Sequence, residues 1–199
     1  MRHPTAGENL AAEAAVVEKS PDVKLSLSFT LATSPEALSA LIRKPLLLLS
    51  LWKAYGFSPR YAAGAIDGGG LHIVDPTGMV GDLFLVEGTN SARRYFGRGA
   101  INHRLVPPFR GSALFDLTMA PDMAATDLKV ELTIRMENRV VGFFVWAFFP
   151  LVRSLAINRI SSNINDLGTI AADLATAPKA TAARIGPVEG TALLEELGR

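Results

Sequence analysis

The sequence LKVELTIRMENRVVGFFVWAFFPLV, residues 128–152, changes its hydrophobic period near its middle. Up to Glu137, apolar and polar residues alternate, which is the pattern of a strand with one buried and one wet face. After Asn138, apolar residues follow at helical spacing to about Ala175. The stretch therefore predicts a strand that leads into one long closing helix, which Pro150 should kink.

The other end of the chain predicts a strand followed by two short helices. Val23–Leu31 alternates in the same way as the later strand. Directly after it, Ser34 is a suitable N-cap and Pro35 suits a first helical turn. Pro45 should end this helix, and a second short helix is expected to run on to about Gly56.

The segment between Arg60 and Glu137 predicts about six strands separated by turn residues. The expected breaks are Asp67–Gly70, Asp75–Gly78, Gly88–Asn90, Pro107–Pro108 and Ala120–Asp122. Together with the first strand this gives an antiparallel sheet of about seven strands. With the helices, the fold class is α+β.

The two ends of the chain differ from this core. Residues 1–21 are small, polar and acidic, and residues 177–199 are rich in Ala, Gly, Thr and Pro, so both are expected to be tails. The folded core domain is then residues 22–176. Leu193, Leu194 and Leu197 have helical spacing and leave open a short docked helix, although a frayed terminus is the favoured interpretation.

Composition excludes several classes of function. Lys and Arg number 20 and Asp and Glu 19, so the net charge of +1 does not favour nucleic acid as a partner. The absence of cysteine excludes disulfides, thiolate metal sites and thiol redox chemistry. Three scattered histidines do not indicate a metal centre, and no cofactor is expected.

The apolar runs do not predict a membrane protein. The strongest run, Val140–Val152, is shorter than the roughly 20 residues that cross a bilayer. The first residues contain no apolar signal core, so a cytoplasmic location is expected.

The order of elements resembles the helix-grip fold of the START and Bet v 1-like (SRPBCC) superfamily. It is similar in particular to bacterial polyketide cyclase/dehydrase and lipid-transport members, in which a strand such as Leu128–Glu137 runs into an apolar helix with an early proline such as Pro150. The resemblance covers about Val23 to Leu174. It implies a curved sheet wrapped around the long helix, with an apolar ligand cavity between them.

Small residues on an inward strand face give independent support for a cavity. On the strand 91–104, Gly97 and Gly99 share the inward parity of Tyr95 and leave space, and the small Ala63 and Ala65 on the earlier strand do the same. Two alternatives remain open: aromatic side chains fill the space, or the glycines permit a bend of the sheet. The candidate ligand-binding residues are Tyr95, Gly97, Gly99, Ile101, His103, Phe115, Leu117, Met119, Val130, Leu132, Ile134, Phe148, Leu151 and Leu155.

The sequence assigns no catalytic residue. Tyr95 and His103 share the inward parity and could orient a ligand or move a proton, although an inward histidine more often bonds a backbone carbonyl. No paired carboxylates and no nucleophile elbow are recognisable. A basic cluster of Arg93, Arg94, Arg98 and Arg104 is best interpreted as a solvated outer face.

The main hypothesis is a binding module that encloses a hydrophobic small molecule, lipid, sterol-like or polyketide-like, as carrier or sensor. One alternative is an enzyme of the cyclase or aromatase kind that uses a polar pocket group. Another is a protein interaction module with a filled core. Residues 143–149 and 46–52 could form an apolar mouth in transient contact with membranes, against the favoured interpretation of buried packing.

Overall fold

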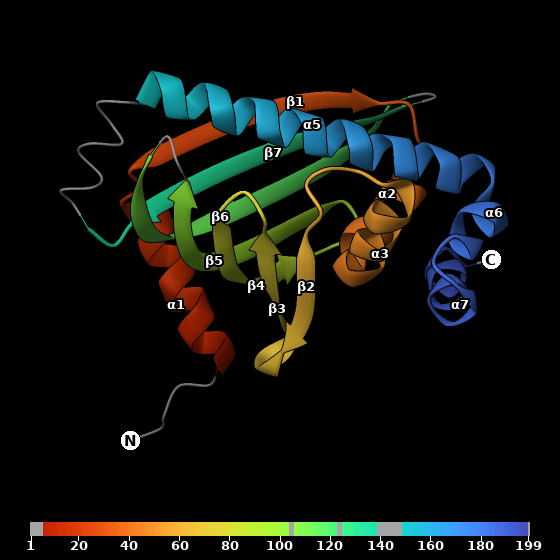
Figure 1. Cartoon of the computed structure of the whole chain (residues 1–199), viewed down its shortest axis with the longest axis horizontal. Helices are drawn as coiled ribbons and strands as arrows, with labels where there is room; N and C mark the ends of the chain where they lie inside the picture. The colour runs from red at the N-terminus through yellow and green to blue at the C-terminus, as the bar shows by residue number, and fades with distance from the viewer. Residues whose placement is uncertain (1–5, 104–105, 123–124, 139–148, 199) are drawn as a thin grey trace.

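A computed structural model of the chain describes residues 6–103, 106–122, 125–138 and 149–198 (Figure 1). The elements in chain order are α1 (Ala6–Lys19), β1 (Val23–Leu31), α2 (Pro35–Arg43), α3 (Pro45–Tyr55), β2 (Ala62–Ile66), η1 (Asp67–Gly69), β3 (Gly70–Asp75), β4 (Met79–Gly88), β5 (Ala92–His103), β6 (Val106–Asp122), β7 (Ala125–Met136), α5 (Phe149–Thr176), α6 (Pro178–Ala183) and α7 (Pro187–Glu196).

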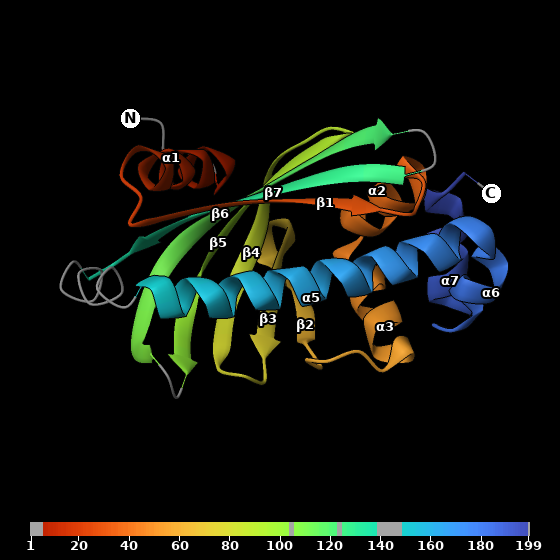
Figure 2. The same cartoon turned by 90° about the horizontal axis from the view of Figure 1, so that it is seen from above.

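The seven strands form one antiparallel sheet in the order β1-β7-β6-β5-β4-β3-β2. The strands from β2 to β7 follow one another as a meander, and β1 pairs with β7. Helix α5 crosses the concave side of this sheet, and α2 and α3 lie near its C-terminal half (Figures 1 and 2). The α+β class and the helix-grip arrangement predicted from the sequence are therefore confirmed.

Local signals place the first strand and the two helices after it where the sequence predicts them. The hydroxyl of Ser34 accepts a hydrogen bond from Ala37 N at 3.2 Å and caps α2. Helix α3 begins at Pro45 and ends against Gly56, whose φ of 74° is the left-handed conformation that glycine adopts at least cost.

The main core lies between α5, β1, α2 and α3. Ile170, Ala171 and Leu174 of α5 are fully buried in it. At Gly168 a Cβ atom would lie 3.0 Å from Leu31 Cδ2, so the missing side chain lets α5 pack closely on β1. Helix α5 is described from Phe149 onward, and the earlier part of the predicted helix lies outside the described residues.

The N-terminal segment, assigned to a tail from the sequence, forms helix α1 on the convex face of the sheet (Figure 2). Ala14 and Val17 are buried there against Phe84, Phe96 and Leu114. The sequence does not reveal this packing because the buried stripe of α1 consists mainly of small residues, which give a weak helical period.

The C-terminal segment also packs on the domain. Helices α6 and α7 fold back beside α3, and Leu193 of α7 is fully buried in the main core. A Cβ atom at Gly190 would lie 2.6 Å from the carbonyl oxygen of Ala182, so the two helices touch at that glycine. Of the two interpretations left open for this end, the docked helix is the one that the structure shows.

Two predicted breaks are wrong. Pro107–Pro108 and Ala120–Asp122 lie inside β6, near its two ends, and Pro121 still pairs with Thr126. A proline removes one donor from the ladder but keeps its carbonyl acceptor, so a strand tolerates it near an end. Strand β6 is consequently longer than its turn residues predict.

Three glycines lie side by side across β4, β5 and β6, and these strands are curved (Figure 2). A Cβ atom at Gly81 would lie 2.6 Å from Arg98 O, one at Gly111 would lie 2.5 Å from Arg135 O, and one at Gly99 would collide with Val80 O. A Cβ atom at Gly97, by contrast, would make only ordinary van der Waals contacts, 3.5 Å from Leu83 and 3.6 Å from Phe115. The glycines therefore serve the curvature of the sheet, which is one of the alternatives that the sequence left open.

The substitution Gly99→Ala should destabilise the protein by about 2 kcal/mol or more, because its Cβ would press on the backbone of β4. Gly64→Ala makes the same change on β2, where nothing lies within 4 Å, and should alter the free energy of unfolding by less than about 1 kcal/mol. Urea denaturation of both variants measures the difference. Equal effects would show that the close approach does not matter.

Candidate functional site

A pocket of about 630 Å³ opens where the concave face of β3, β4 and β5 meets the junction of α2 and α3 and the last turns of α7. This volume lies in the range of small-molecule sites. Its lining residues are Arg43, Lys44, Pro45, Leu46, Leu47, Gly69, Leu71, Leu83, Leu85, Tyr95, Ala192, Glu195 and Glu196.

Five of the thirteen lining residues are leucines, and part of this leucine wall faces solvent. Leu71 is buried and Leu47 and Leu83 are half-buried, whereas Leu46 is 39% and Leu85 46% exposed. Covering apolar surface that is in contact with water lowers the free energy by about 25 cal/mol per Å². An apolar molecule can therefore bind against the leucines while the charged lining residues keep their present partners.

Tyr95 lies at the floor of the pocket and has a structural partner. Its hydroxyl donates a hydrogen bond to Ile42 O at 2.8 Å, which ties β5 to the end of α2. Burial raises the pKa of the Tyr95 phenol, and the nearby Arg93 opposes this effect. The Tyr95 hydroxyl therefore stays protonated, and its proton is used in the hydrogen bond to the Ile42 carbonyl.

The rim of the pocket is charged. Arg43 Nε pairs with the Glu196 carboxylate, Arg43 Nη2 donates to Glu196 O at 3.1 Å, and Lys44 Nζ lies 3.4 Å from Glu196 Oε2. Burial alone would raise the pKa of Glu196, but the hydrogen bonds and charges of Arg43 and Lys44 outweigh it and hold the pKa below its ordinary value. These contacts fasten the end of α7 to the α2–α3 junction.

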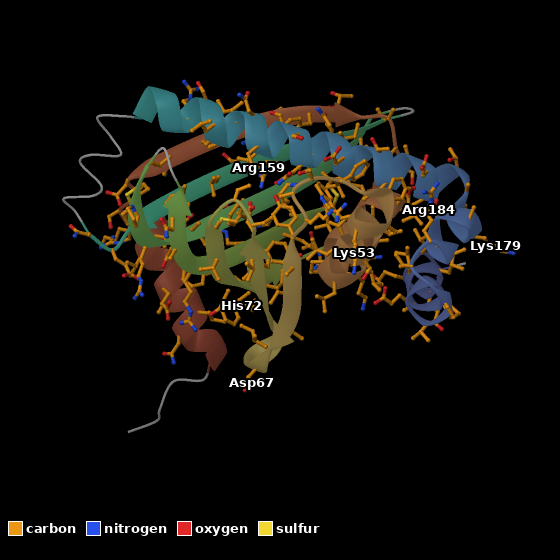
Figure 3. The ribbon with its side chains drawn as sticks, viewed as in Figure 1. Lys53, Asp67, His72, Arg159, Lys179 and Arg184 are labelled. Carbon is orange, nitrogen blue, oxygen red and sulfur yellow. The ribbon has the colours of Figure 1, made fainter. Side chains whose placement is uncertain are left out.

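A second polar cluster joins α5 to the end of β3. Arg159 Nη2 donates to Asp75 Oδ2 at 2.6 Å, and its guanidinium lies 5.7 Å from the centre of the Tyr61 ring. Asn163 Nδ2 donates to the Tyr61 hydroxyl at 2.7 Å. Figure 3 shows Arg159 on the side of α5 that faces the sheet. The cluster holds the middle of α5 over the open edge of the concave face.

Asp75 is the buried acid of this cluster. Its burial would raise the pKa of the carboxyl, but hydrogen bonds from the hydroxyl and backbone N–H of Thr77, and then from Arg159, outweigh burial and lower the pKa below its ordinary value of 3.8. Sequence reasoning missed the cluster because Arg159 and Asp75 are 84 residues apart. The Asp-Pro-Thr-Gly turn was the one visible signal.

The described strand residues among those predicted to bind a ligand share one face of the sheet but are spread along it. Strand pairing places Tyr95 beside Phe115 and Phe115 beside Leu132. The same register gives one face to Gly97, Gly99, Ile101, Leu117, Met119, Val130 and Ile134. Among the described members of that predicted set, Tyr95 lines the pocket. Phe148 and the side chains of His103 and Leu151 lie outside the described residues.

The remaining predicted residues have other surroundings. Met119, Val130 and Leu132 are buried, and Leu155 on α5 is 39% exposed. Tyr95 and His103 are eight residues apart on β5, which corresponds to about 26 Å of extended backbone. Strand parity predicts the face of a residue but carries no information on distances along the strand.

The arginines of β5 divide between the two faces. On the convex face Arg94 Nε lies 2.6 Å from Asp116 Oδ1, and Arg98 lies 3.9 Å from Asp82 Oδ2. Arg93 has the opposite parity and is half-buried, and Arg104 lies outside the described residues. The expected solvated outer face therefore holds for Arg94 and Arg98.

Two further properties concern the described residues as a set. No group of three His, Asp or Glu side chains within residues 6–103, 106–122, 125–138 and 149–198 could hold a metal ion. In the same ranges, no helix combines the length and apolar character that a membrane span requires.

Comparisons with known proteins match the fold. A conserved protein from Geobacillus kaustophilus matches with a TM-score of 0.56 at 14% identity, over 76% of this chain and 97% of that one. A protein from Rhizobium leguminosarum matches with a TM-score of 0.50 at 10% identity, over 74% and 92%. The structure of Ara h 8.0201 matches with a TM-score of 0.43 at 12% identity, over 58% and 79%.

Sequence comparisons gave no relative. A scan against protein families found no match, and neither did a search of curated proteins. At 10% to 14% identity the structural matches show a shared fold and nothing of a ligand.

The substitution Asp75→Asn should cost about 1–2 kcal/mol of stability at pH 7, because it leaves the partly exposed Arg159 without its carboxylate. A carboxyl group whose pKa is lower in the folded than in the unfolded protein stabilises the fold at pH values above its unfolded-state pKa. This stabilisation is lost as the pH falls through its folded-state pKa. The difference from the unmodified protein should therefore shrink as the pH falls below 3.8.

Thermal or urea unfolding between pH 3 and pH 7 measures this effect. Asp67→Asn, the same change at the exposed tip of the β2–β3 turn (Figure 3), is the matched control and should alter the free energy of unfolding at pH 7 by less than about 0.5 kcal/mol. A constant Asp75→Asn deficit at all pH values would contradict the role of the ionised carboxylate.

Proposed function

We propose that this helix-grip protein binds a hydrophobic small molecule, as a carrier or sensor, in the pocket between the concave sheet face, the α2–α3 junction and α7. The observation that carries the proposal is the leucine wall of this 630 Å³ pocket, which stays partly open to solvent at Leu46 and Leu85. The ligand class is a lipid, a sterol-like or a polyketide-like molecule, because such molecules offer mainly apolar surface.

The energetics support binding of a molecule with a hydrocarbon chain. Each methylene group removed from water contributes about 0.8 kcal/mol, so ten of them contribute about 8 kcal/mol. Association costs at least about 4 kcal/mol in lost freedom. The leucine wall can therefore supply most of the affinity, and Gly97, Phe115 and Leu117 continue the apolar floor beyond it.

Binding fits the lining better than the alternatives do. A cyclase or aromatase needs a proton-transfer group inside the pocket, whereas the Tyr95 hydroxyl donates to a backbone carbonyl and the charged lining residues lie at the rim. An interaction module with a filled core does not need an open leucine wall.

The variant Leu46→Trp should lower the affinity for a fluorescent fatty acid at least about tenfold, because an indole at the exposed mouth fills space that the ligand chain requires. Val16→Trp on α1 changes an apolar residue that is 50% exposed and lies outside the pocket, and it should bind like the unmodified protein. Fluorescence titration measures both affinities.

Native mass spectrometry and organic extraction of the purified protein give an independent readout. A stoichiometric apolar molecule that is lost in Leu46→Trp and retained in Val16→Trp supports the proposal. A protein that carries no apolar molecule and binds neither fatty acids nor sterols would overturn it.

A further inference from the structure

Two cations meet at one side of the pocket. Arg43 is the last residue of α2, and Lys44 is the N-cap residue of α3. The first turn of α3, Pro45 to Leu47, lines the same side, and no side chain caps this end of the helix. A helix N-terminus carries partial positive charge, so it adds to the field of the two side chains.

An internal carboxylate already occupies this positive field. Glu196, the last residue of α7, pairs with Arg43 and lies 3.4 Å from Lys44. Its neighbour Glu195 also lines the pocket but forms no ion pair within the part of the chain that the structure describes. Of the two neighbouring glutamates, Glu196 is therefore the one that pairs with Arg43 and Lys44.

We propose that Arg43 and Lys44 form a subsite for the acid group of an amphiphilic ligand, and that the Glu196 carboxylate holds this subsite until the ligand displaces it. The inference rests on the proposed function and names its ligand class. The ligand is a molecule with a carboxylate or a similar anion at one end and a hydrocarbon chain along Leu46, Leu83 and Leu85.

The charges explain why a free acid is recognised at this place. The side chains of Arg43 and Glu196 are 24% and 19% exposed, so water screens their attraction only in part. A ligand acid that replaces Glu196 keeps both cations paired, whereas an uncharged head group would leave them with Glu196. The subsite therefore selects acids over alcohols of the same chain.

The exchange needs little movement of α7. Leu193 is fully buried in the main core and holds the middle of the helix. Glu196 lies one turn later, at the end of the helix, and Gly198 follows with a φ of 69°. Release of the last turn would remove Glu196 from the subsite together with the partly buried Leu197, while Leu193 would keep the rest of α7 docked.

The test compares decanoic acid with decanol, which share one chain and differ in charge. Glu196→Gln should raise the ratio of acid affinity to alcohol affinity about three- to fivefold, because the internal competitor loses its charge. Lys44→Gln should lower this ratio, and its side chain is half exposed, so the substitution is tolerated in folding. Glu195→Gln, the matched control, should leave the ratio unchanged.

Hydrogen exchange of the last turn of α7 gives the second readout. Decanoic acid should reduce protection of this turn in the unmodified protein, and decanol should not. An acid-to-alcohol ratio that is equal in Glu196→Gln and Glu195→Gln would overturn the subsite while leaving the pocket intact. Failure of both molecules to bind any variant would instead contradict the proposed function.

Discussion

The close approach of strand backbones, of β4 to β5 and of β6 to β7, is the constraint on which the rest of this structure depends. Gly81, Gly99 and Gly111 lie side by side on β4, β5 and β6, and each leaves no room for a Cβ atom. The sheet bends sharply there, and its concave face can then wrap one helix. A flatter sheet would leave α5 in contact with fewer strands and would open the concave face to water.

Helix α5 is held over this concave face at several points that differ in chemistry. Its C-terminal half is buried against α2, α3 and β1, with Gly168 in contact with Leu31. Its middle is joined to β3 by the ion pair of Arg159 with Asp75. The Tyr55 hydroxyl donates to Asp173 Oδ2 at 2.7 Å and links α3 to the same helix. Apolar burial supplies the stability, and the polar contacts fix the position of the helix.

The pocket exists because these elements leave one corner of the concave face uncovered. The α2–α3 junction and α7 border that corner without filling it, and the wall facing it consists of leucines with Tyr95 at the floor. The charged rim couples the corner to the C-terminal helix through a single carboxylate, Glu196. Ligand binding and the docking of α7 therefore share one set of cations, which is the physical basis of the proposed preference for acids.

The sequence by itself determined what depends on neighbouring residues. Alternation predicted β1 and β7, Ser34 and the prolines placed α2 and α3, and parity put Tyr95 and Phe115 on one face. Only the tertiary structure decided that α1 and α7 dock, that Gly99 serves a bend, and that the pocket lies between Lys44, Leu85 and Glu196. Periodicity fixes the face of a residue, but a pocket and an ion pair depend on distances between segments far apart in the chain, which no local pattern contains.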